Sequence, residues 1–315
     1  MTVQSMKKTI FIIAAALIIA FFINNSCTAV DPFFAKGKNN EQIVYTMVNV
    51  CDESQQGDAH VLKFADNVVY VIDAGGGNYT ARKKLEIFLK NKNISTIDKL
   101  FISHAHKDHY EGIFNVIKSG IKIKTVYFNL PNKEACDREK PWGCDYDDVL
   151  RTLTFIRDHG IPVETLKAND LFFPEKDVTL QVLAVFDGNN TPVGKTDIND
   201  TSMIMKLVYG NTSILFAGDL NVKLGSFFVQ YPYNVKADIL KVPHHGAESV
   251  APNAFFDAVS PELALVPAPK DLWLSDRSKR IRDYFSSKKI PVLVSGINGD
   301  VTVILYKDRF EIEKK

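Results

Sequence analysis

The chain has 315 residues and a formal net charge of +1. A chain of this length is long enough to bury the core of one large domain. The balance of charges excludes a strongly basic surface for nucleic acid and a long charged tail. An anionic substrate would therefore have to be attracted by local features.

The first 27 residues are typical of an export signal. Lys7 and Lys8 precede an apolar run over residues 9–23, which is shorter than the roughly 20 residues of a membrane span. Cys27 follows at the end of this region, as in a loosely matching lipoprotein leader. We expect an exported protein, periplasmic or at the cell surface, with membrane attachment through a lipidated Cys27. A retained membrane helix and a leader without lipid are the alternatives.

Residues 28–40 are interpreted as a linker and residues 41–315 as a single folded domain. Apolar and β-branched runs alternate there with segments of helical spacing. Predicted strands cover residues 42–50, 60–64, 67–74, 98–104, 124–130, 178–186, 237–245, 262–268, 291–296 and 301–306, and residues 202–219 predict a hairpin with a Gly-Asn turn. Predicted helices cover residues 79–93, 110–120, 146–160, 221–231 and 275–288. This order of elements predicts an α/β fold in which two sheets pack together with helices outside.

Three cysteines lie in the predicted domain. Cys136 and Cys144 are close enough in sequence to form a disulfide in an exported protein, closing the loop "DREKPWG". Cys51 is expected to be an unpaired thiol at a strand end. The loop offers too few ligands for a structural zinc ion.

Polar side chains gather where apolar strands end. Asp73 ends "VVYVIDAGGG", residues 104–109 ("HAHKDH") follow "KLFIS", Asp219 ends "SILFAGD", and His244 and His245 end "ILKVPHH". Several strand ends that meet at one sheet edge would bring these groups into one cleft. Imidazole and carboxylate groups are ligands of zinc and similar divalent ions. Five of the seven histidines lie in these clusters, whereas His60 and His159 are expected to be an ordinary core or surface histidine each.

The spacing within these clusters favours two ions. His104 and His106 are two residues apart, so both point the same way in an extended segment. Asp108 and His109 can serve a second ion, and Asp219 is a natural bridging carboxylate. Two ions about 3.5–4 Å apart lower the pKa of a shared water toward about 7, which gives hydroxide at neutral pH. Zinc is the expected metal, with manganese as the alternative.

The segment "SHAHKDHYEG" matches the His-x-His-x-Asp-His signature of the metallo-β-lactamase-fold hydrolases, and "IDAG" and "AGD" occur in that family's order. The segments "QGDAHVLKF", "NDTSMIMKLVYGNTSILFAGDL" and "ADILKVPHHG" resemble the hydrolase domain of ComEC-type DNA-uptake proteins and their stand-alone relatives. The resemblance covers about residues 42–306. It implies a four-layer αββα sandwich with a dinuclear metal site at one edge.

The resemblance also implies a role for each residue of the motifs. The implied metal ligands are His104 and His106 for the first ion, Asp108, His109 and His244 for the second, and Asp219 as the bridge. His245 would donate a proton or hold an oxyanion, and Asp108 is the other residue predicted to act in catalysis. The residues implied to support the site without binding metal are Asp58, Asp73, Asn199 and Ser202.

Three departures from the family pattern concern the substrate more than the fold. No third histidine for the first ion lies between His109 and Asp219, so water or an oxygen ligand such as Asp200 would complete that site. The segment "PAPKDLWLSDRSK" has no histidine where relatives have one. Ala247 replaces the serine of the usual "HHGS".

We therefore expect an exported, metal-dependent hydrolase that attacks a phosphodiester in nucleic acid or in phosphorylated surface material. The substrate would be a small or polymeric phosphodiester, although the sequence shows no strong nucleic-acid patch and gives no oligomeric state. The alternatives are an acyl-bond hydrolase of lactamase or lactonase type and a metal-bound binding protein without catalysis.

Overall fold

The computed structural model describes residues 42–53, 55–140, 143–231 and 234–314. The predicted signal peptide, the lipidation site and the linker lie outside these ranges. Within these ranges, no helix has both the length and the apolar character needed to cross a membrane.

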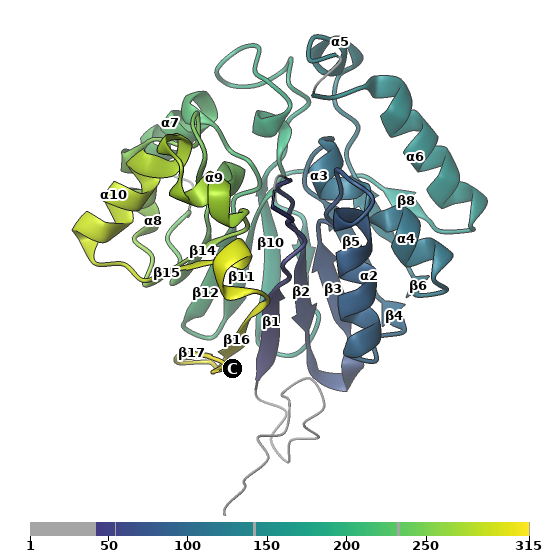
Figure 1. Ribbon diagram of the computed structural model, residues 1–315, viewed down its shortest axis with the longest axis horizontal. Coiled ribbons are helices and arrows are strands. Elements are labelled where there is room, and N and C mark those ends of the chain that lie inside the picture. Colours follow the sequence, from purple (N-terminus) through teal and green to yellow (C-terminus); the bar gives the residue numbers. More distant parts are fainter. Residues whose placement is uncertain (1–41, 54, 141–142, 232–233, 315) are drawn as a thin grey trace, which may run out of the picture. The chain divides into compact units, whose positions relative to one another are not determined.

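Two large sheets form the centre of the domain (Figure 1). The first sheet has the spatial order β17-β16-β1-β2-β3-β5-β7-β8. Its strands are β1 (Ile43–Met47), β2 (His60–Lys63), β3 (Val69–Ile72), β5 (Lys99–Ile102), β7 (Val126–Phe128), β8 (Val163–Glu164), β16 (Val301–Leu305) and β17 (Phe310–Ile312). Strands β3, β5, β7 and β8 run parallel to one another, and the remaining pairs are antiparallel.

The second sheet has the order β15-β14-β13-β12-β11-β10-β9. Its strands are β9 (Leu171–Phe172), β10 (Val178–Ala184), β11 (Ile204–Tyr209), β12 (Thr212–Phe216), β13 (Ile239–Lys241), β14 (Leu263–Val266) and β15 (Val292–Val294). Strands β12 to β15 are parallel. A small third sheet pairs β4 (Thr96–Ile97) with β6 (Lys122–Ile123).

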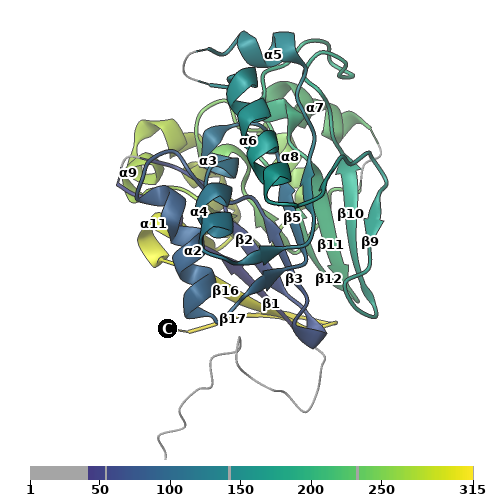
Figure 2. The ribbon, with the colours of Figure 1, turned by 90° about the vertical axis from the view of Figure 1, so that its right-hand side faces the viewer.

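Helices cover the outer face of each sheet, which gives four layers (Figures 1 and 2). The helices beside the first sheet include α2 (Ala81–Asn91), α4 (Ile113–Lys118) and α6 (Tyr146–Asp158), and those beside the second are α7 (Val222–Gln230), α8 (Asn253–Val259) and α10 (Lys279–Lys288). The other helices are α3 (Lys107–Tyr110), α5 (Lys133–Asp137), α9 (Lys270–Leu274) and α11 (Ser295–Asn298), with short 3₁₀ turns η1 (Ala65–Asn67), η2 (Asn199–Thr201), η3 (Pro243–Gly246) and η4 (Asp276–Ser278). The predicted αββα sandwich is confirmed.

Alternation along the strands directs apolar side chains to both faces of each sheet. One core lies between the sheets and includes Tyr45, Phe101 and Phe216. A second core lies between the second sheet and its helices, and there Phe256 and Phe285 are completely buried. Burial of side chains this large stabilises the fold by roughly 1.5–3 kcal/mol each. The two cores therefore fix both sheets and the strand ends that carry the polar clusters.

The predicted hairpin at residues 202–219 is confirmed as β11 and β12. The predicted helix 110–120 is instead interrupted, because the Gly112 amide donates to the carbonyl of Gly75 at 2.8 Å. A Cβ at Gly112 would lie 1.9 Å from the carbonyl oxygen of Ala74, so only glycine allows this close approach. The contact ties the loop after β3 to the segment that holds Asp108 and His109. The sequence analysis missed α5, α8, α9 and several two- or three-residue strands.

The cysteines pair as the sequence predicts. Cys136 and Cys144 form a disulfide, and Cys51 is a buried free thiol. His60 is buried and hydrogen-bonded on both ring nitrogens, and His159 is the exposed residue that ends α6. Both of these histidines have the ordinary roles expected from the sequence.

Candidate metal centre

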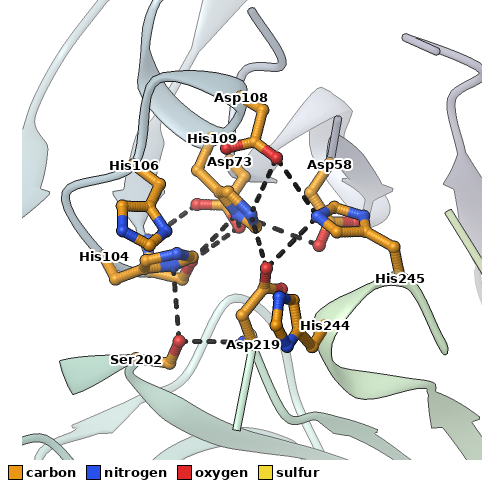
Figure 3. A network of polar contacts seen from close by, with 12 residues as sticks. Asp58, Asp73, His104, His106, Asp108, His109, Ser202, Asp219, His244 and His245 are labelled. Carbon is orange, nitrogen blue, oxygen red and sulfur yellow. Dashed lines mark hydrogen bonds and ion pairs between the residues drawn. The ribbon is translucent and has the colours of Figure 1, made fainter. Parts of the chain in front are cut away.

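Strand ends from both sheets bring histidine and carboxylate groups together at one edge of the sandwich (Figure 3). Parallel strands end at the same edge of a sheet, which is the usual position of a site in such folds. Segments after β3 and β5 of the first sheet face segments after β12 and β13 of the second. The side chains that gather there are Asp58, Asp73, His104, His106, Asp108, His109, Ser202, Asp219, His244 and His245.

Four donor atoms converge at one place, which we call the second metal position. The Nε2 atom of His245 lies 3.2 Å from Oδ2 of Asp108 and 3.2 Å from Oδ2 of Asp219. The Nε2 atom of His109 lies 3.2 Å from the same Asp219 oxygen and 3.9 Å from Oδ2 of Asp108. His245 Nε2 and Asp108 Oδ2 are buried without an aligned hydrogen bond. His109 Nε2 does hydrogen-bond to Asp219 Oδ2 at 3.2 Å, so two of the four atoms are unpaired, and buried unpaired donors that share a centre suit a bound cation.

At this position, the attraction between imidazole and carboxylate groups outweighs the effect of burial on the histidine pKa values. Burial disfavours a charged imidazole, but the carboxylates of Asp219, Asp73 and Asp108 still raise the pKa of His109 well above its usual value. Against the same effect of burial, Asp219 and Asp108 raise the pKa of His245 to about 10. Without metal, the carboxylates therefore hold protonated histidines, and a divalent cation would replace those protons.

His104 marks a neighbouring place, which we call the first metal position. Its Nδ1 atom donates to Ser103 Oγ at 3.0 Å, since that hydroxyl donates its own proton to Asp73. Its Nε2 atom is buried and has no hydrogen-bond partner. Burial, followed by the nearby imidazoles of His109 and His106, lowers the pKa of His104 well below its usual value. The ring is therefore neutral, and Nε2 offers a free lone pair.

His106 stands beside His104, with the two ring centroids 4.8 Å apart (Figure 3). Its Nε2 atom lies 2.7 Å from Oε2 of Glu139. No hydrogen bond to another described residue occupies its Nδ1 atom, which leaves that nitrogen for a ligand. Glu139 lies just after α5, between the two disulfide cysteines, and the sequence analysis did not identify it.

Hydrogen bonds to atoms that do not face the metal positions orient the candidate ligands. Asp73 accepts from His109 Nδ1 at 2.8 Å and from the Ser103 amide at 2.7 Å. Ser202 Oγ accepts from the Asp219 amide at 2.9 Å. Gly218 permits this contact, because its φ is +47° and a Cβ there would lie 2.3 Å from the Cβ of Ser202. Asp73 and Ser202 thus lie where the sequence predicts support residues.

A buried lysine, which the sequence analysis missed, joins two carboxylates of the site. Lys241 is 1% exposed, and its Nζ atom contacts Oδ1 of Asp219 at 3.1 Å and pairs with Asp58. Asp58 also accepts from His60 at 2.8 Å. Because Lys241 occupies Oδ1 of Asp219, the other oxygen of this carboxylate remains for the metal positions. The signal in the sequence is a charged residue within the buried strand "DILKV".

The two adjacent histidines lie in the opposite order to that expected from the sequence. His245 reaches the second metal position, and its Nδ1 atom donates to the carbonyl of Pro267 at 2.7 Å. His244 points elsewhere: its Nδ1 atom bonds Oδ1 of Asn221 at 2.8 Å. Both residues have positive φ, 48° and 52°, so the chain turns sharply and separates the rings, whose centroids are 6.4 Å apart. The sequence analysis expected His244 at this position and His245 beside it, and the structure shows the opposite placement.

A polar cleft of about 450 Å³ opens above the site. Its walls include His106, Asp108, Asn199 and His244. Asn199 Oδ1 is buried without a hydrogen-bond partner. Asp200, considered above as a ligand, faces a neighbouring cavity instead, and its Oδ1 atom accepts from the Asn221 amide at 2.8 Å.

Sets of described residues satisfy the geometry of metal binding, with all donor atoms of a set within 4.8 Å of one another. Two of these sets are His104 with His109 and Asp219, and Asp108 with His109 and His245. A third set joins Asp58, Asp73 and His109, but Lys241 and Ser103 already bond its carboxylates. The orphaned atoms His104 Nε2, His245 Nε2 and Asp108 Oδ2 lie in the first two sets, so the residues fit divalent metal ions.

This fold and site define a family of hydrolases. The chain belongs to the metallo-beta-lactamase superfamily, whose model matches residues 54–268. It is similar to ComE operon protein 3 of Bacillus subtilis, with 26% identity over 72% of this chain and 27% of that protein. It is also similar to competence protein ComA of Neisseria gonorrhoeae, with 34% identity over 56% of this chain and 21% of the relative. The chain spans less than a third of the length of these curated relatives.

Solved structures agree on the fold. The metallo-beta-lactamase fold protein YhfI from Bacillus subtilis superposes with a TM-score of 0.50, 11% identity and coverage of 86% of this chain and all of the other. Igni18, a metallo hydrolase from Ignicoccus hospitalis, gives a TM-score of 0.50 with 15% identity, over 82% of this chain and 98% of the other. The resemblance to competence proteins seen in the motifs is confirmed.

Proposed function

We propose that this protein is an exported hydrolase that uses two divalent metal ions to cleave a phosphodiester, with zinc as the expected metal. The observation that carries the proposal is the convergence of buried, unpaired donor atoms from both sheets on two adjacent positions. His104 and His106 would hold the first ion, and Asp108, His109 and His245 the second. Asp219, with one oxygen fixed by Lys241, would bridge them. Ions bound there would supply Lewis acidity and an activated water.

The walls of the cleft support an anionic substrate. Gln55, Gln56, Asn199 and Lys107 all line it. Amide and ammonium groups donate hydrogen bonds to phosphoryl oxygens, while the cleft offers little apolar surface for an acyl group. Lys107 is held at the rim by Asp148 at 2.9 Å. These contacts favour a charged ester over a lactam or lactone.

His244 takes over the proton-transfer role that the sequence assigned to His245. Asn221 Nδ2 donates to Asp197 at 2.8 Å, so its Oδ1 atom must accept from His244 Nδ1. His244 therefore presents Nε2 as its remaining nitrogen, and the residue lines the cleft. Because Nδ1–H is given to Asn221, Nε2 would donate to the leaving oxygen as a general acid only in the imidazolium form, and burial lowers the pKa of His244.

Two further observations bear on substrate and location. One relative is named a competence protein, and a nucleic-acid phosphodiester is consistent with that name. The Cys136–Cys144 disulfide is typical of an oxidising compartment, which supports export together with the predicted N-terminal signal. Membrane attachment through Cys27 remains part of this proposal.

The test combines elemental analysis with a panel of a phosphodiester, a phosphomonoester, a lactam and a lactone. We expect two ions per chain and cleavage of the phosphodiester alone. Asp108→Ala or His109→Ala should reduce that activity by at least about 10³-fold, since each removes a ligand of the second position. The control is His159→Ala at the exposed end of α6. Normal turnover in both ligand variants, or hydrolysis of the lactam instead, would overturn the proposal.

A further inference from the structure

Four imidazoles face the two metal positions, and each is held through the nitrogen that does not face them. His104, His109 and His245 use Nδ1 for this purpose, bonded to Ser103, Asp73 and the Pro267 carbonyl respectively. His106 is reversed: its Nε2 atom is the held nitrogen, and the acceptor is the carboxylate of Glu139 at 2.7 Å.

We propose that Glu139 is a positioning residue for the first metal position, holding Nε2–H of His106 so that Nδ1 binds the ion. This inference rests on the proposed two-metal function. A carboxylate on the outer nitrogen fixes the tautomer and the ring orientation, and it makes the inner nitrogen a stronger donor. Asp73 has the same relation to His109 at the second position.

The carboxylate of Glu139 is itself fixed in place. Its Oε1 atom accepts from the Ile198 amide at 2.7 Å, and Oε2 accepts from the Cys144 amide at 3.3 Å. Cys144 is joined to Cys136 by the disulfide that closes this loop. The Glu139 side chain is 19% exposed and lines the cavity that also contains Asp200, next to the cleft above the site. Contacts from two separate segments therefore aim this carboxylate at His106.

The geometry separates this role from that of a metal ligand. Glu139 bonds Nε2, while the free nitrogen of His106 is on the other side of the ring. A carboxylate on the outer nitrogen cannot reach an ion bound to the inner one. The first position lacks a third histidine. Fixing the ring of His106 should therefore matter more for metal affinity there than in a site with three imidazoles.

The test measures metal binding rather than turnover, using cobalt(II) titration followed by visible absorption, with a chelator as competitor. Glu139→Ala should lower the affinity for the first ion by about 10–100-fold and leave the affinity for the second unchanged. Glu139→Gln should bind the first ion within a few-fold of the unmodified protein, because its amide oxygen still accepts from Nε2–H. The control is Glu134→Gln, an exposed residue of α5 that pairs with Lys195.

Two outcomes overturn the inference. One is tight binding of both ions by Glu139→Ala. The other is equal loss of the first ion in the Gln and Ala variants, which would show that an acceptor for Nε2–H of His106 is not what holds the ring. Circular dichroism checks that each variant is folded. If the unmodified protein binds no cobalt at all, the proposed function fails, which is a different result from a Glu139 variant that changes nothing.

Discussion

The two metal positions differ in what holds their donors. The second position takes carboxylates and imidazoles from strand ends of both sheets, and His109, Asp219 and His245 are almost completely buried there. Besides the shared Asp219, the first position relies on two imidazoles, one of which is supported by a disulfide-closed loop that also forms a wall of the cleft. Donors fixed by two cores lose little entropy on binding. We infer that the second ion binds more tightly and that the first position is the adaptable one.

The charges sharpen this difference. Asp108 contributes a negative charge to the second position alone, Asp219 would be shared by both positions, and His104 and His106 add no charge to the first. A cation therefore gains more electrostatic energy at the second position, in a region of low dielectric. Lys241 limits the excess of negative charge, because its ammonium group pairs with both Asp58 and Asp219.

The largest expected effect comes from substituting each of the two adjacent histidines by alanine in turn. His245→Ala should weaken the second ion by more than about 100-fold, since a ligand matters more than the outer partners whose loss costs 10–100-fold. His244→Ala should keep both ions but slow hydrolysis by about 10²–10⁴-fold, as expected for a general acid. Elemental analysis and steady-state rates separate the two. Loss of metal in His244→Ala with retention in His245→Ala would restore the order predicted from the sequence.

That pair also shows where prediction from the sequence ends. Strand patterns and motif order predicted the sandwich and the edge at which the donors meet, because strand ends follow from hydrophobic alternation. They do not predict which of two adjacent histidines turns inward. That choice depends on the left-handed backbone conformation of His244 and His245, for which neither spacing nor composition gives a signal.

Lys241 and Glu139 were missed for different reasons. Lys241 lies in a strand whose apolar pattern indicates burial, so its charge was visible as an exception, but its partners are distant in sequence. Glu139 lies in a loop, 33 residues from His106, and no local periodicity connects the two. Residues that support ligands through tertiary contacts are therefore harder to predict than the ligands, which the motif itself contains.

A second prediction compares the metal-free protein at different pH values. The folded pKa of His245 is about 10 against about 6.5 unfolded, so its charge stabilises the fold fully below pH 6.5. That stabilisation is lost as the pH rises toward 10, and it amounts to about 5 kcal/mol as an upper bound. Urea unfolding with EDTA should therefore show stability falling across this window.

The matched control for the pH series is His245→Asn, which should reduce that fall and leave the part that comes from the raised pKa of His109. Saturating metal should reverse the trend in the unmodified protein, because the ion stabilises most once the ligand protons have left. Equal slopes in the variant and the unmodified protein would show that the imidazole charge of His245 does not stabilise the metal-free fold.

The smallest effect is expected at the loop that supports the first position. Changing Cys136 and Cys144 together to Ser should lower the free energy of unfolding by about 2–3 kcal/mol, as for a short disulfide loop. It should weaken the first ion only a few-fold, because Glu139 keeps its bond to the Ile198 amide, and leave the second ion unaffected. Cobalt titration and urea unfolding on the same samples measure both quantities. A loss of the second ion, or of both equally, would contradict the inference that the disulfide-closed loop supports the first position alone.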